Sequence, residues 1–385
     1  MVGYMSAGAS VAIVGIGETK FARRSESSVG ELAVQAVRAA IADAGLTPAQ
    51  VDGIVPVIAE PAADDIAAAV GMQRRFTGMA GYVPGAGALS AAATAKLALD
   101  AGLADYVVVY LGYGSSRPGG PYTFHAKDPV KASYEMPFGF YGQPVYFAAW
   151  QQRYCHDYNV KPDDLAGVSM AARQWARLTP GAQETRPLSL SGYLASPMIS
   201  SPLRKADCCL LTDGAAACVL TSVERARDLP NPPAVLSGYG LASMDVTMHD
   251  IFTQKPDFLE LGSRMSGPRA YASAGIGPGD IDVALVYDCF STSLVLQLED
   301  LGLCPRGEGF AFANDGHISP GGSLPVNTHG GHLSYAYLPG VVHIAEAVKQ
   351  IRGARGVAQI PGAEVALVSA LGGNDHASLV ITKDR

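Results

Sequence analysis

A repeated pattern places the strongest limit on how this chain can fold. Residues 44–55 read AGLTPAQVDGIV and residues 274–285 read AGIGPGDIDVAL, so the pattern A-G-[LI]-x-P-x-x-[VI]-D occurs once in each half of the sequence. In both copies an Ala-rich helical stretch comes first, Gly ends the helix, and a short apolar run typical of a buried strand follows a turn. We therefore expect two halves of similar architecture.

The two halves also agree beyond the repeat. A Gly-rich start, a helical stretch and a buried strand that runs into glycine occupy residues 85–114 in the first half and residues 330–375 in the second. Each half is therefore expected to be β-α-β-α-β, and such alternation predicts parallel sheets covered by helices. We place the first half at residues 1–230 and the second at residues 231–385, which makes an α/β protein.

Residues 115–206 differ from the rest of the first half. They are aromatic, rich in proline and irregular, with one helical pattern at residues 162–178. We interpret this segment as an insertion that covers a site. Its aromatic stretch at residues 121–150 could cover a fused-ring ligand or form a dimer contact, and both interpretations stay open.

Charge and cysteine content narrow the class of protein. The 385 residues carry a net charge of −7 without a Lys/Arg cluster, which argues against a nucleic-acid groove. No run of about 18 apolar residues could span a bilayer, and the start lacks a secretory pattern. The six cysteines form no CxxC pair and no metal-finger spacing. We expect a cytoplasmic protein that acts on small molecules.

Four segments are predicted to meet at one edge of the sheets. In sheets of this kind, ligands collect where the carboxyl ends of strands face the starts of helices. Three of the segments contain glycines, at residues 85–87, 330–331 and 372–373, and the fourth is the strand end at residues 283–291. Glycines there would let backbone N–H groups approach a ligand oxygen closely. Any single glycine could instead serve helix–sheet packing.

Four longer stretches carry a family resemblance. They are VAIVGIGETKF at residues 11–21, PLRKADCCLLTDGAAACVLTS at 202–222, VNTHGGHLSYAYLPG at 326–340 and SALGGNDHASLVI at 369–381. Together they resemble the thiolase superfamily, specifically its lipid-transfer-protein or sterol-carrier-type branch. The resemblance covers nearly the whole chain. It implies the thiolase fold, in which two β-α-β-α-β halves form five α-β-α-β-α layers with an inserted loop domain.

The resemblance also identifies where thiolase chemistry would take place. A thiolase uses a nucleophilic Cys at a helix start, a second Cys as base, and a His and an Asn that stabilise a thioester oxyanion. These four slots fall on Gly85, Ala370, Tyr337 and Tyr287, respectively. Because both cysteines are missing, acyl transfer by the thiolase route is excluded. Thiol chemistry from Cys289, two residues after Tyr287, stays open beside an ordinary core position.

Both oxyanion-site positions have become tyrosine, which suggests a different reaction. A phenol has an ordinary pKa of about 10 and can donate or accept a proton. The branch with this pair resembles the steroid side-chain aldolases, which cleave a β-hydroxyacyl-CoA into a carbonyl compound and a shorter acyl-CoA. By this hypothesis Tyr337 takes the proton from the alcohol and Tyr287 donates one to the enolate. The two roles could be reversed.

Further residues could support the two phenols. A phenol that abstracts an alcohol proton needs a lowered pKa or a relay, and His332, His329 or Asp288 could supply the relay; each could equally be a structural hydrogen-bonding residue. Backbone N–H groups near Gly85 and Gly372 could hold the thioester oxygen. His329 and His332 are three residues apart with no third potential ligand nearby in the sequence, so we expect no metal site.

The resemblance further implies a substrate and partners. The substrate would be a CoA thioester, with a steroid or bile-acid side chain and with propionyl-CoA or acetyl-CoA as the shorter product. CoA is then part of the substrate, and no cofactor is expected to be bound. The protein would be a homodimer that works with an OB-fold partner bearing a zinc ribbon, in a hetero-oligomer that could include an acyl-CoA hydratase. Two alternatives remain: a thiolase-like acyltransferase, and a non-catalytic acyl-CoA- or lipid-binding subunit.

Overall fold

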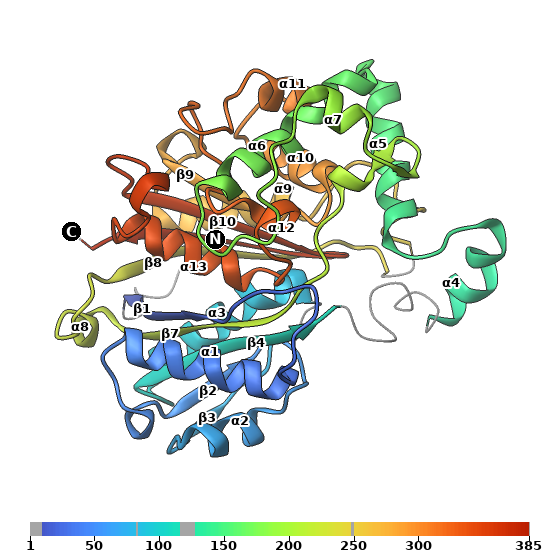
Figure 1. Ribbon diagram of the computed structural model, residues 1–385. Helices are drawn as coiled ribbons and strands as arrows, with labels where there is room; N and C mark the ends of the chain where they lie inside the picture. The colour runs from blue at the N-terminus through green and yellow to red at the C-terminus, as the bar shows by residue number, and fades with distance from the viewer. Residues whose placement is uncertain (1–9, 82–83, 116–127, 248–249, 385) are drawn as a thin grey trace, which may run out of the picture.

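The computed structural model of the protein describes residues 10–81, 84–115, 128–247 and 250–384 (Figure 1). The elements of the first half before the insertion are β1 (Val11–Glu18), α1 (Val29–Asp43), η1 (Pro48–Gln50), β2 (Gly53–Pro56), α2 (Ala63–Val70), β3 (Phe76–Thr77), α3 (Pro84–Asp100) and β4 (Tyr106–Gly114). Two further elements follow the insertion, namely β7 (Asp213–Ser222) and α8 (Val223–Ala226).

The second half repeats this order with its own additions. Its elements are β8 (Ala234–Ser243), α9 (Ser263–Ala274), η7 (Pro278–Asp280), β9 (Val283–Val286), α10 (Ser291–Asp300), α11 (Gly309–Asn314), α12 (Gly331–Ser334), α13 (Val341–Ile351), η8 (Gly356–Ala358), β10 (Val365–Gly372) and β11 (Asp375–Lys383). The predicted pair of similar halves is confirmed.

The repeated pattern forms the same local structure twice. Helices α1 and α9 are each followed by a glycine with φ +70°, Gly45 and Gly275, in the left-handed conformation that L side chains rarely adopt. A single 3₁₀ turn with proline at its start follows in each half, and then the short buried strand β2 or β9. The spacing of glycine, proline and apolar residues therefore specified the helix end, the turn and the strand.

The strands form a mixed sheet, not the parallel sheets that the sequence predicted. Their order is β3-β2-β4-β7-β1-β8-β11-β10-β9. Strand β2 is parallel to β4 and β9 is parallel to β10, but β7 is antiparallel to both β4 and β1, and β11 is antiparallel to both β10 and β8. The expectation was wrong for the last strand of each half. Between β10 and β11 the chain reverses over Gly373 and Asn374, which is too short for a parallel crossover.

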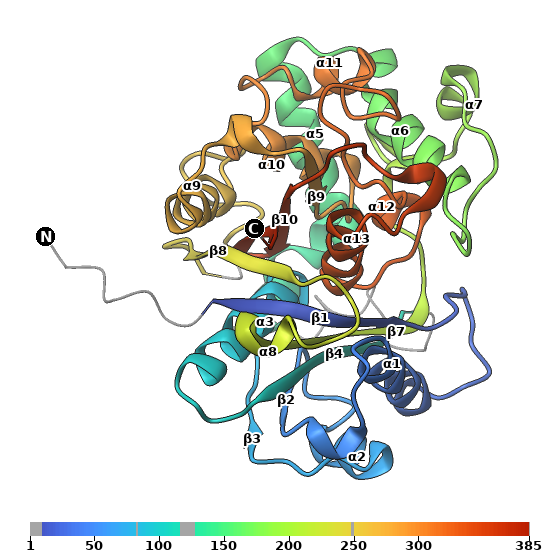
Figure 2. The ribbon, with the colours of Figure 1, turned by 90° about the vertical axis from the view of Figure 1, so that its left-hand side faces the viewer.

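The layers follow the α-β-α-β-α order (Figures 1 and 2). Helices α3 and α13 lie in the middle and contact strands of both halves, whereas α1 covers the outer face of the first half and α9 that of the second. The strands β1 and β8 pair briefly between Val11–Ile13 and Ala234–Leu236 and so join the halves. The first turns of the two middle helices, α3 and α13, are thereby brought to one edge of the sheets.

The outer helices lie close to their sheets because glycines face them. A Cβ atom added to Gly17 of β1 would lie 2.2 Å from the carbonyl oxygen of Ala36 in α1. In the other half, a Cβ added to Gly240 of β8 would lie 2.0 Å from the carbonyl oxygen of Ser266 in α9. The same close backbone approach therefore occurs in both halves, at the two G-x-G sequences of β1 and β8.

The insertion between β4 and β7 contains most of the remaining elements. These are α4 (Pro129–Tyr134), η4 (Met136–Phe138), α5 (Gln143–Tyr158), η5 (Pro162–Leu165), α6 (Ala166–Arg177), α7 (Leu190–Leu194), β5 (Met198–Ser200), β6 (Leu203–Arg204) and η6 (Lys205–Asp207). Residues 116–127 of the predicted insertion lie outside the described residues. Figure 1 shows α4 projecting away from the body, whereas α5 and α6 pack over the second half.

The aromatic residues of the insertion fall into two groups. Tyr146 and Trp150 of α5 are fully buried and pack against Phe252. Tyr134 and Phe138, which lie near the projecting α4, are 74% and 82% exposed. The first group builds a core between the insertion and the second half, and the second group lies on the surface. Within the part of the chain that the structure describes, no helix is long and apolar enough to cross a membrane.

Candidate active site

The start of α3 meets the end of β10 at Gly85. A Cβ atom at this position would lie 1.7 Å from the carbonyl oxygen of Leu371 and 3.2 Å from Cζ of Tyr287. No side chain can be accommodated at this distance from the backbone of β10. Ala370 is fully buried one residue before Leu371, and Gly372 ends the strand. The predicted slots at Gly85 and Ala370 thus lie at one place, beside the ring of Tyr287.

Tyr287 follows the last residue of β9 and is held by its backbone. Its N–H donates to the carbonyl oxygen of Ser369 in β10 at 2.9 Å, and its carbonyl oxygen accepts from the Gln297 amide of α10 at 2.7 Å. The side chain is 5% exposed. These bonds continue the parallel pairing of β9 with β10 by one residue and aim the phenol across the strand end.

Tyr337 reaches the same place from the other side. It lies in the segment between α12 and α13, and its N–H donates to Oγ1 of Thr212 at 2.8 Å. Its hydroxyl group lies 2.9 Å from that of Tyr287, within hydrogen-bonding distance. The structure therefore joins the two tyrosines that the sequence predicted as acid and base, which are fifty residues apart.

A third phenol lies next to this pair. The ring of Tyr113, near the end of β4, packs edge-on against Tyr337 with 5.7 Å between the ring centroids. Burial raises the pKa of Tyr113 to about 12. The pKa values of Tyr287 and Tyr337 lie well above the ordinary value of 10, mainly because burial disfavours the charged phenolate. All three phenols are therefore neutral at physiological pH.

Asp288 holds the backbone that leads to Tyr337. This fully buried carboxyl accepts hydrogen bonds from the N–H groups of His332 at 2.8 Å and Leu333 at 3.4 Å, both in the single turn of α12. Gly331 permits this approach, because a Cβ there would lie 2.0 Å from Oδ2 of Asp288 and its φ is +62°. Burial raises the pKa of Asp288, an effect that the nearby His343 and the two N–H groups partly offset.

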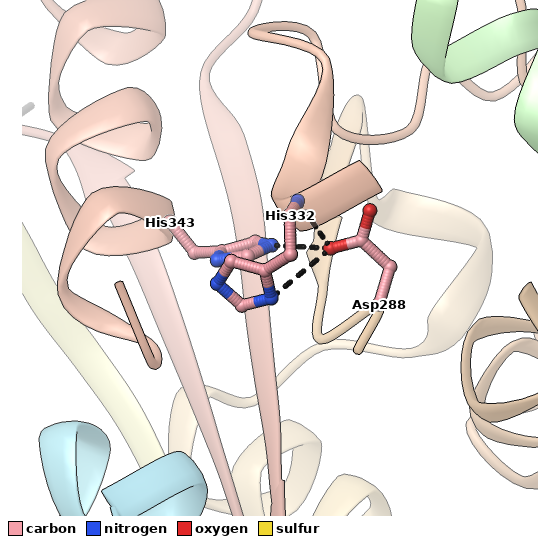
Figure 3. Close-up of side chains that lie close together, drawn as sticks. All are labelled: Asp288, His332 and His343. Atoms are coloured by element: carbon pink, nitrogen blue, oxygen red, sulfur yellow. Dashed lines mark hydrogen bonds and ion pairs between the residues drawn. The ribbon is translucent and has the colours of Figure 1, made fainter. Parts of the chain in front are cut away.

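His332 and His343 both lie close to the carboxyl group of Asp288 (Figure 3). Nδ1 of His332 is 3.2 Å from Oδ1 of Asp288, and its Nε2 is 3.2 Å from the carbonyl oxygen of Leu338. The His332 ring packs edge-on against Tyr287 and Tyr337, with centroid distances of 4.8 and 5.2 Å. Burial and the neighbouring His343 lower the pKa of His332 well below 6.5.

The expectation that His332 has no third potential ligand nearby is wrong. Nε2 of His343, in α13, lies 3.5 Å from Oδ1 of Asp288, and the candidate donor atoms of Asp288, His332 and His343 all lie within 4.8 Å of one another. Such a group could hold a metal ion. The signal was absent from the sequence because the three residues come from three different elements, which only the fold brings together.

His329, the second histidine of the predicted relay, lies farther from the phenol pair. Its ring packs against Tyr335 and His343, in each case with 5.0 Å between centroids. Its pKa is lowered well below 6.5, mainly by burial. His329 therefore reaches the cluster around Asp288 only through the ring of His343.

The cysteines near the site are not activated. Burial raises the pKa of Cys289 to about 12 and that of Cys208 to about 12, and it raises the pKa of Cys209 well above 9. A nucleophilic cysteine needs the opposite shift, since the thiolate is the reactive form. This argues for the core position over thiol chemistry for Cys289, whose Sγ faces the hydroxyl group of Ser293 at 3.5 Å.

Sequence reasoning missed three residues of this site: Tyr113, Thr212 and His343. Tyr113 lies in the strand end LGYG, a pattern that predicts only a strand running into glycine. Thr212 precedes β7, and His343 lies in the first turns of α13. A polar side chain in the buried start of α13 was the one available signal for His343. For the other two residues the contact depends on strand order, which the sequence pattern did not predict.

Comparison with known proteins gives a consistent result. A family model described as "Thiolase C-terminal domain-like" matches residues 245–383. The chain is 37% identical to a steroid side-chain-cleaving aldolase of Thermomonospora curvata, with 98% of each chain covered. It is 36% identical to a 17-hydroxy-3-oxo-4-pregnene-20-carboxyl-CoA lyase of Mycobacterium tuberculosis, with 96% of this chain and 98% of the relative covered.

Two solved structures are also similar to this chain. The structure described as "Ltp2-ChsH2(DUF35) aldolase" has a TM-score of 0.91 at 36% identity, with 98% of each chain covered. A monomeric SCP2-thiolase-like protein of Mycobacterium smegmatis has a TM-score of 0.75 at 21% identity. The match covers 97% of this chain and 78% of that protein. The second likeness supports the fold alone.

Proposed function

This chain belongs to the thiolase-like family of sterol-carrier type, together with the steroid side-chain-cleaving aldolases, and from that premise we propose that it is a retro-aldolase. It is a carbon–carbon lyase acting on acyl-CoA thioesters. The proposed substrate is a β-hydroxyacyl-CoA with a steroid or bile-acid side chain. The products are a ketone or aldehyde and a shorter acyl-CoA, propionyl-CoA or acetyl-CoA, with CoA as part of the substrate and no bound cofactor.

The observation that carries this proposal is the hydrogen bond between the hydroxyl groups of Tyr287 and Tyr337, 2.9 Å long. In a retro-aldol cleavage the β-hydroxyl loses its proton, the Cα–Cβ bond breaks, its electron pair forms the thioester enolate, and Cα is then protonated. One proton leaves oxygen and one arrives at carbon, so the reaction needs no net proton source. Two bonded phenols can pass that proton between them.

The raised pKa values fit this form of the mechanism. Neither phenol is expected to ionise on its own near neutral pH, because burial disfavours the phenolate. When Tyr337 takes the alcohol proton, it can release its own proton to Tyr287, which donates to the enolate carbon. The reverse direction uses the same bond. No free phenolate is needed at any step, so this form of the mechanism requires neither a lowered phenol pKa nor a separate relay residue.

The thioester oxygen would be held beside Gly85 and Gly372, where α3 starts and β10 ends. The close contact between Gly85 and the Leu371 carbonyl brings these two backbones together next to Tyr287. Backbone N–H groups at such a place can stabilise a developing enolate charge. The acyltransferase alternative has less support, because position 85 has no space for a side chain and burial raises the pKa of the nearby thiols.

We also propose the assembly. The protein forms a homodimer in the cytoplasm and works with a separate OB-fold partner that bears a zinc ribbon, in a complex that could include an acyl-CoA hydratase. The similarity to a solved aldolase whose description includes a DUF35 component supports a hetero-oligomer. Co-expression with such a partner, followed by size-exclusion chromatography with light scattering, tests this assembly. Elution of both chains separately would contradict it.

The function is tested by separate Tyr287→Phe and Tyr337→Phe substitutions, which remove only the hydroxyl groups. Each should lower kcat for cleavage of 17-hydroxy-3-oxo-4-pregnene-20-carboxyl-CoA about 10²–10⁴-fold, the usual contribution of a general acid or base. Both products are measured by liquid chromatography and mass spectrometry, with the proposed partner present.

Tyr335→Phe is the matched control. This phenol lies two residues from Tyr337, but its hydroxyl group donates to Glu18 at 3.3 Å, away from the pair. Its loss should leave cleavage nearly unchanged. Full turnover by both the Tyr287 and the Tyr337 variants would refute the proton-transfer mechanism. Binding of the acyl-CoA without either product in the wild type would favour the non-catalytic subunit.

A further inference from the structure

One imidazole ring connects the residues that follow the two phenols. Nδ1 of His332 faces Asp288, the residue after Tyr287, and Nε2 contacts the carbonyl oxygen of Leu338, the residue after Tyr337. Both distances are 3.2 Å. The ring itself packs edge-on against both phenol rings. His332 therefore spans the gap between the β9 end and the segment after α12, and these two pieces of chain set the separation of the hydroxyl groups.

The hydrogen-bond partners of His332 determine where its protons must lie. The carbonyl oxygen of Leu338 can only accept, so Nε2 must carry a hydrogen. Nδ1 lies 3.2 Å from Oδ1 of Asp288 but forms no hydrogen bond with it. The ring is therefore held through Nε2, and the backbone N–H of the same residue is held by Asp288.

The same carboxyl group fixes the turn that carries His332. Asp288 accepts the N–H groups of His332 and Leu333, so its two oxygens anchor α12 from outside the helix. The closeness of Gly331 to Oδ2 of Asp288 leaves no space for any other residue at the first position of this turn. Asp288 thus contacts both the backbone and the ring of His332.

We propose that His332 is a positioning residue: its bond to the Leu338 carbonyl oxygen and its contacts with both phenol rings keep the hydroxyl groups of Tyr287 and Tyr337 within hydrogen-bonding distance. The kinetic part of this inference rests on the proposed function, whereas its geometric part does not. In the part of the chain that the structure describes, His332 touches the phenol rings and forms no hydrogen bond with either hydroxyl group. It therefore acts through the tyrosines.

Two substitutions of His332 separate the two contacts. The amide of His332→Asn can occupy the place of Nδ1 and keep the contact with Asp288, whereas the longer His332→Gln can occupy the place of Nε2 and keep the contact with Leu338. His332→Ala loses both. We expect kcat to fall about 10-fold in the first two and about 100-fold in the third, because a displacement of about 1 Å can cost that much. KM should stay within about twofold, since His332 lies behind the tyrosines.

The separation of the two phenol oxygens is the readout that does not depend on activity. Crystal structures of the Asn and Gln variants should show it lengthened from 2.9 Å to beyond hydrogen-bonding range, or the Tyr337 ring displaced. His317→Asn is the matched control. Nδ1 of His317 lies 2.7 Å from the Ser323 hydroxyl oxygen and its ring stacks on Phe312, and neither residue belongs to the phenol site, so its variant should keep wild-type kcat and phenol geometry.

The outcomes distinguish this inference from the function. If the wild-type protein cleaves no acyl-CoA, the proposed function fails, and the oxygen separation still decides the positioning role. If the Asn and Gln variants fold, keep the phenols 2.9 Å apart and retain kcat, the positioning role is wrong. A stoichiometric metal ion in the purified protein, measured by elemental analysis, would show that His332 serves as a metal ligand instead. If only the Ala variant unfolds, the Asn and Gln variants decide whether His332 positions the tyrosines.

Discussion

At the scale of single residues, the site is defined as much by what is missing as by the two phenols. In a thiolase the start of the central helix presents a cysteine, whereas here Gly85 brings its backbone against β10 so closely that the Leu371 carbonyl occupies the place of a Cβ atom. From the same Cβ position, Cζ of the Tyr287 ring is 3.2 Å away. Loss of the cysteine and placement of the tyrosine are therefore linked by geometry.

This link predicts the result of restoring the cysteine. Gly85→Cys should not create an acyltransferase, because its Cβ would overlap the Leu371 carbonyl oxygen. The variant should lose about 1–3 kcal/mol or more of the free energy of unfolding, the usual cost of overpacking, and its aldol cleavage should fall at least about 10-fold as Tyr287 is displaced. Urea denaturation and incubation with acetyl-CoA, followed by mass spectrometry of the protein, measure both. A stable variant that forms an acyl-enzyme would contradict the described geometry.

At the scale of elements, the two halves share a way of packing a helix onto a strand. Gly17 of β1 and Gly240 of β8 each face a carbonyl oxygen of the outer helix, at distances that no side chain permits. Helices α1 and α9 can consequently lie directly on the sheet backbone. Helix α1 also contacts β4, the strand that carries Tyr113, so its packing bears on one side of the candidate site.

Replacing either glycine should therefore disturb the protein in the same way. Gly17→Ala and Gly240→Ala should each lower the free energy of unfolding by about 1–3 kcal/mol or more, because the methyl group must push α1 or α9 away from its strand. Urea denaturation followed by circular dichroism measures the effect.

Gly30→Ala is the control for these two variants. Gly30 lies in the first turn of α1, and a Cβ there would meet only the hydroxyl oxygen of Ser28, 4.0 Å away. Alanine should be neutral or stabilise the helix by a few tenths to about 1 kcal/mol. If the Gly17 and Gly240 variants are as stable as the Gly30 variant, the close packing does not hold in solution.

At the scale of the whole molecule, local patterns and long-range contacts differ in what the sequence can predict. The glycines after α1 and α9, the turns and the short strands followed from spacing alone, because each depends on neighbouring residues. The meeting of Tyr287 and Tyr337 was expected only through the family resemblance. Nothing in the spacing showed that β7 and β11 run antiparallel, or that His343 lies near Asp288, because these contacts depend on how separate elements pack.

The buried histidines give the whole molecule a specific response to acid. His376 of β11 is fully buried, with Nδ1 at 2.6 Å from the Ser266 hydroxyl and Nε2 at 3.1 Å from the amide oxygen of Gln297. Burial lowers its pKa to about 3. Because an unfolded histidine titrates near 6.5, the unfolded state binds more protons than the folded state between about pH 6.5 and 3. Stability should therefore fall as the pH decreases through this window.

The contribution of His376 can be isolated by substitution. Between pH 7.5 and 5 it should account for about 2 kcal/mol of the loss in the free energy of unfolding, from 1.36 kcal/mol per pH unit below 6.5. His376→Asn can keep a contact with Ser266 but has no group that titrates, so the variant should start less stable and then lose about 2 kcal/mol less than the wild type. Urea denaturation at pH 7.5, 6 and 5 measures this difference.

His156→Asn should not show this change. The His156 side chain is 82% exposed and faces Asp157 at 3.1 Å, so folding does not remove it from water. Its variant should lose nearly as much stability on acidification as the wild type, because the buried histidines are the same in both. An equal loss in the His376 variant and the wild type would mean that this histidine is protonated, or reaches water, in the folded protein. In the second case β11, which pairs with β10 beside the candidate site, would open in mild acid.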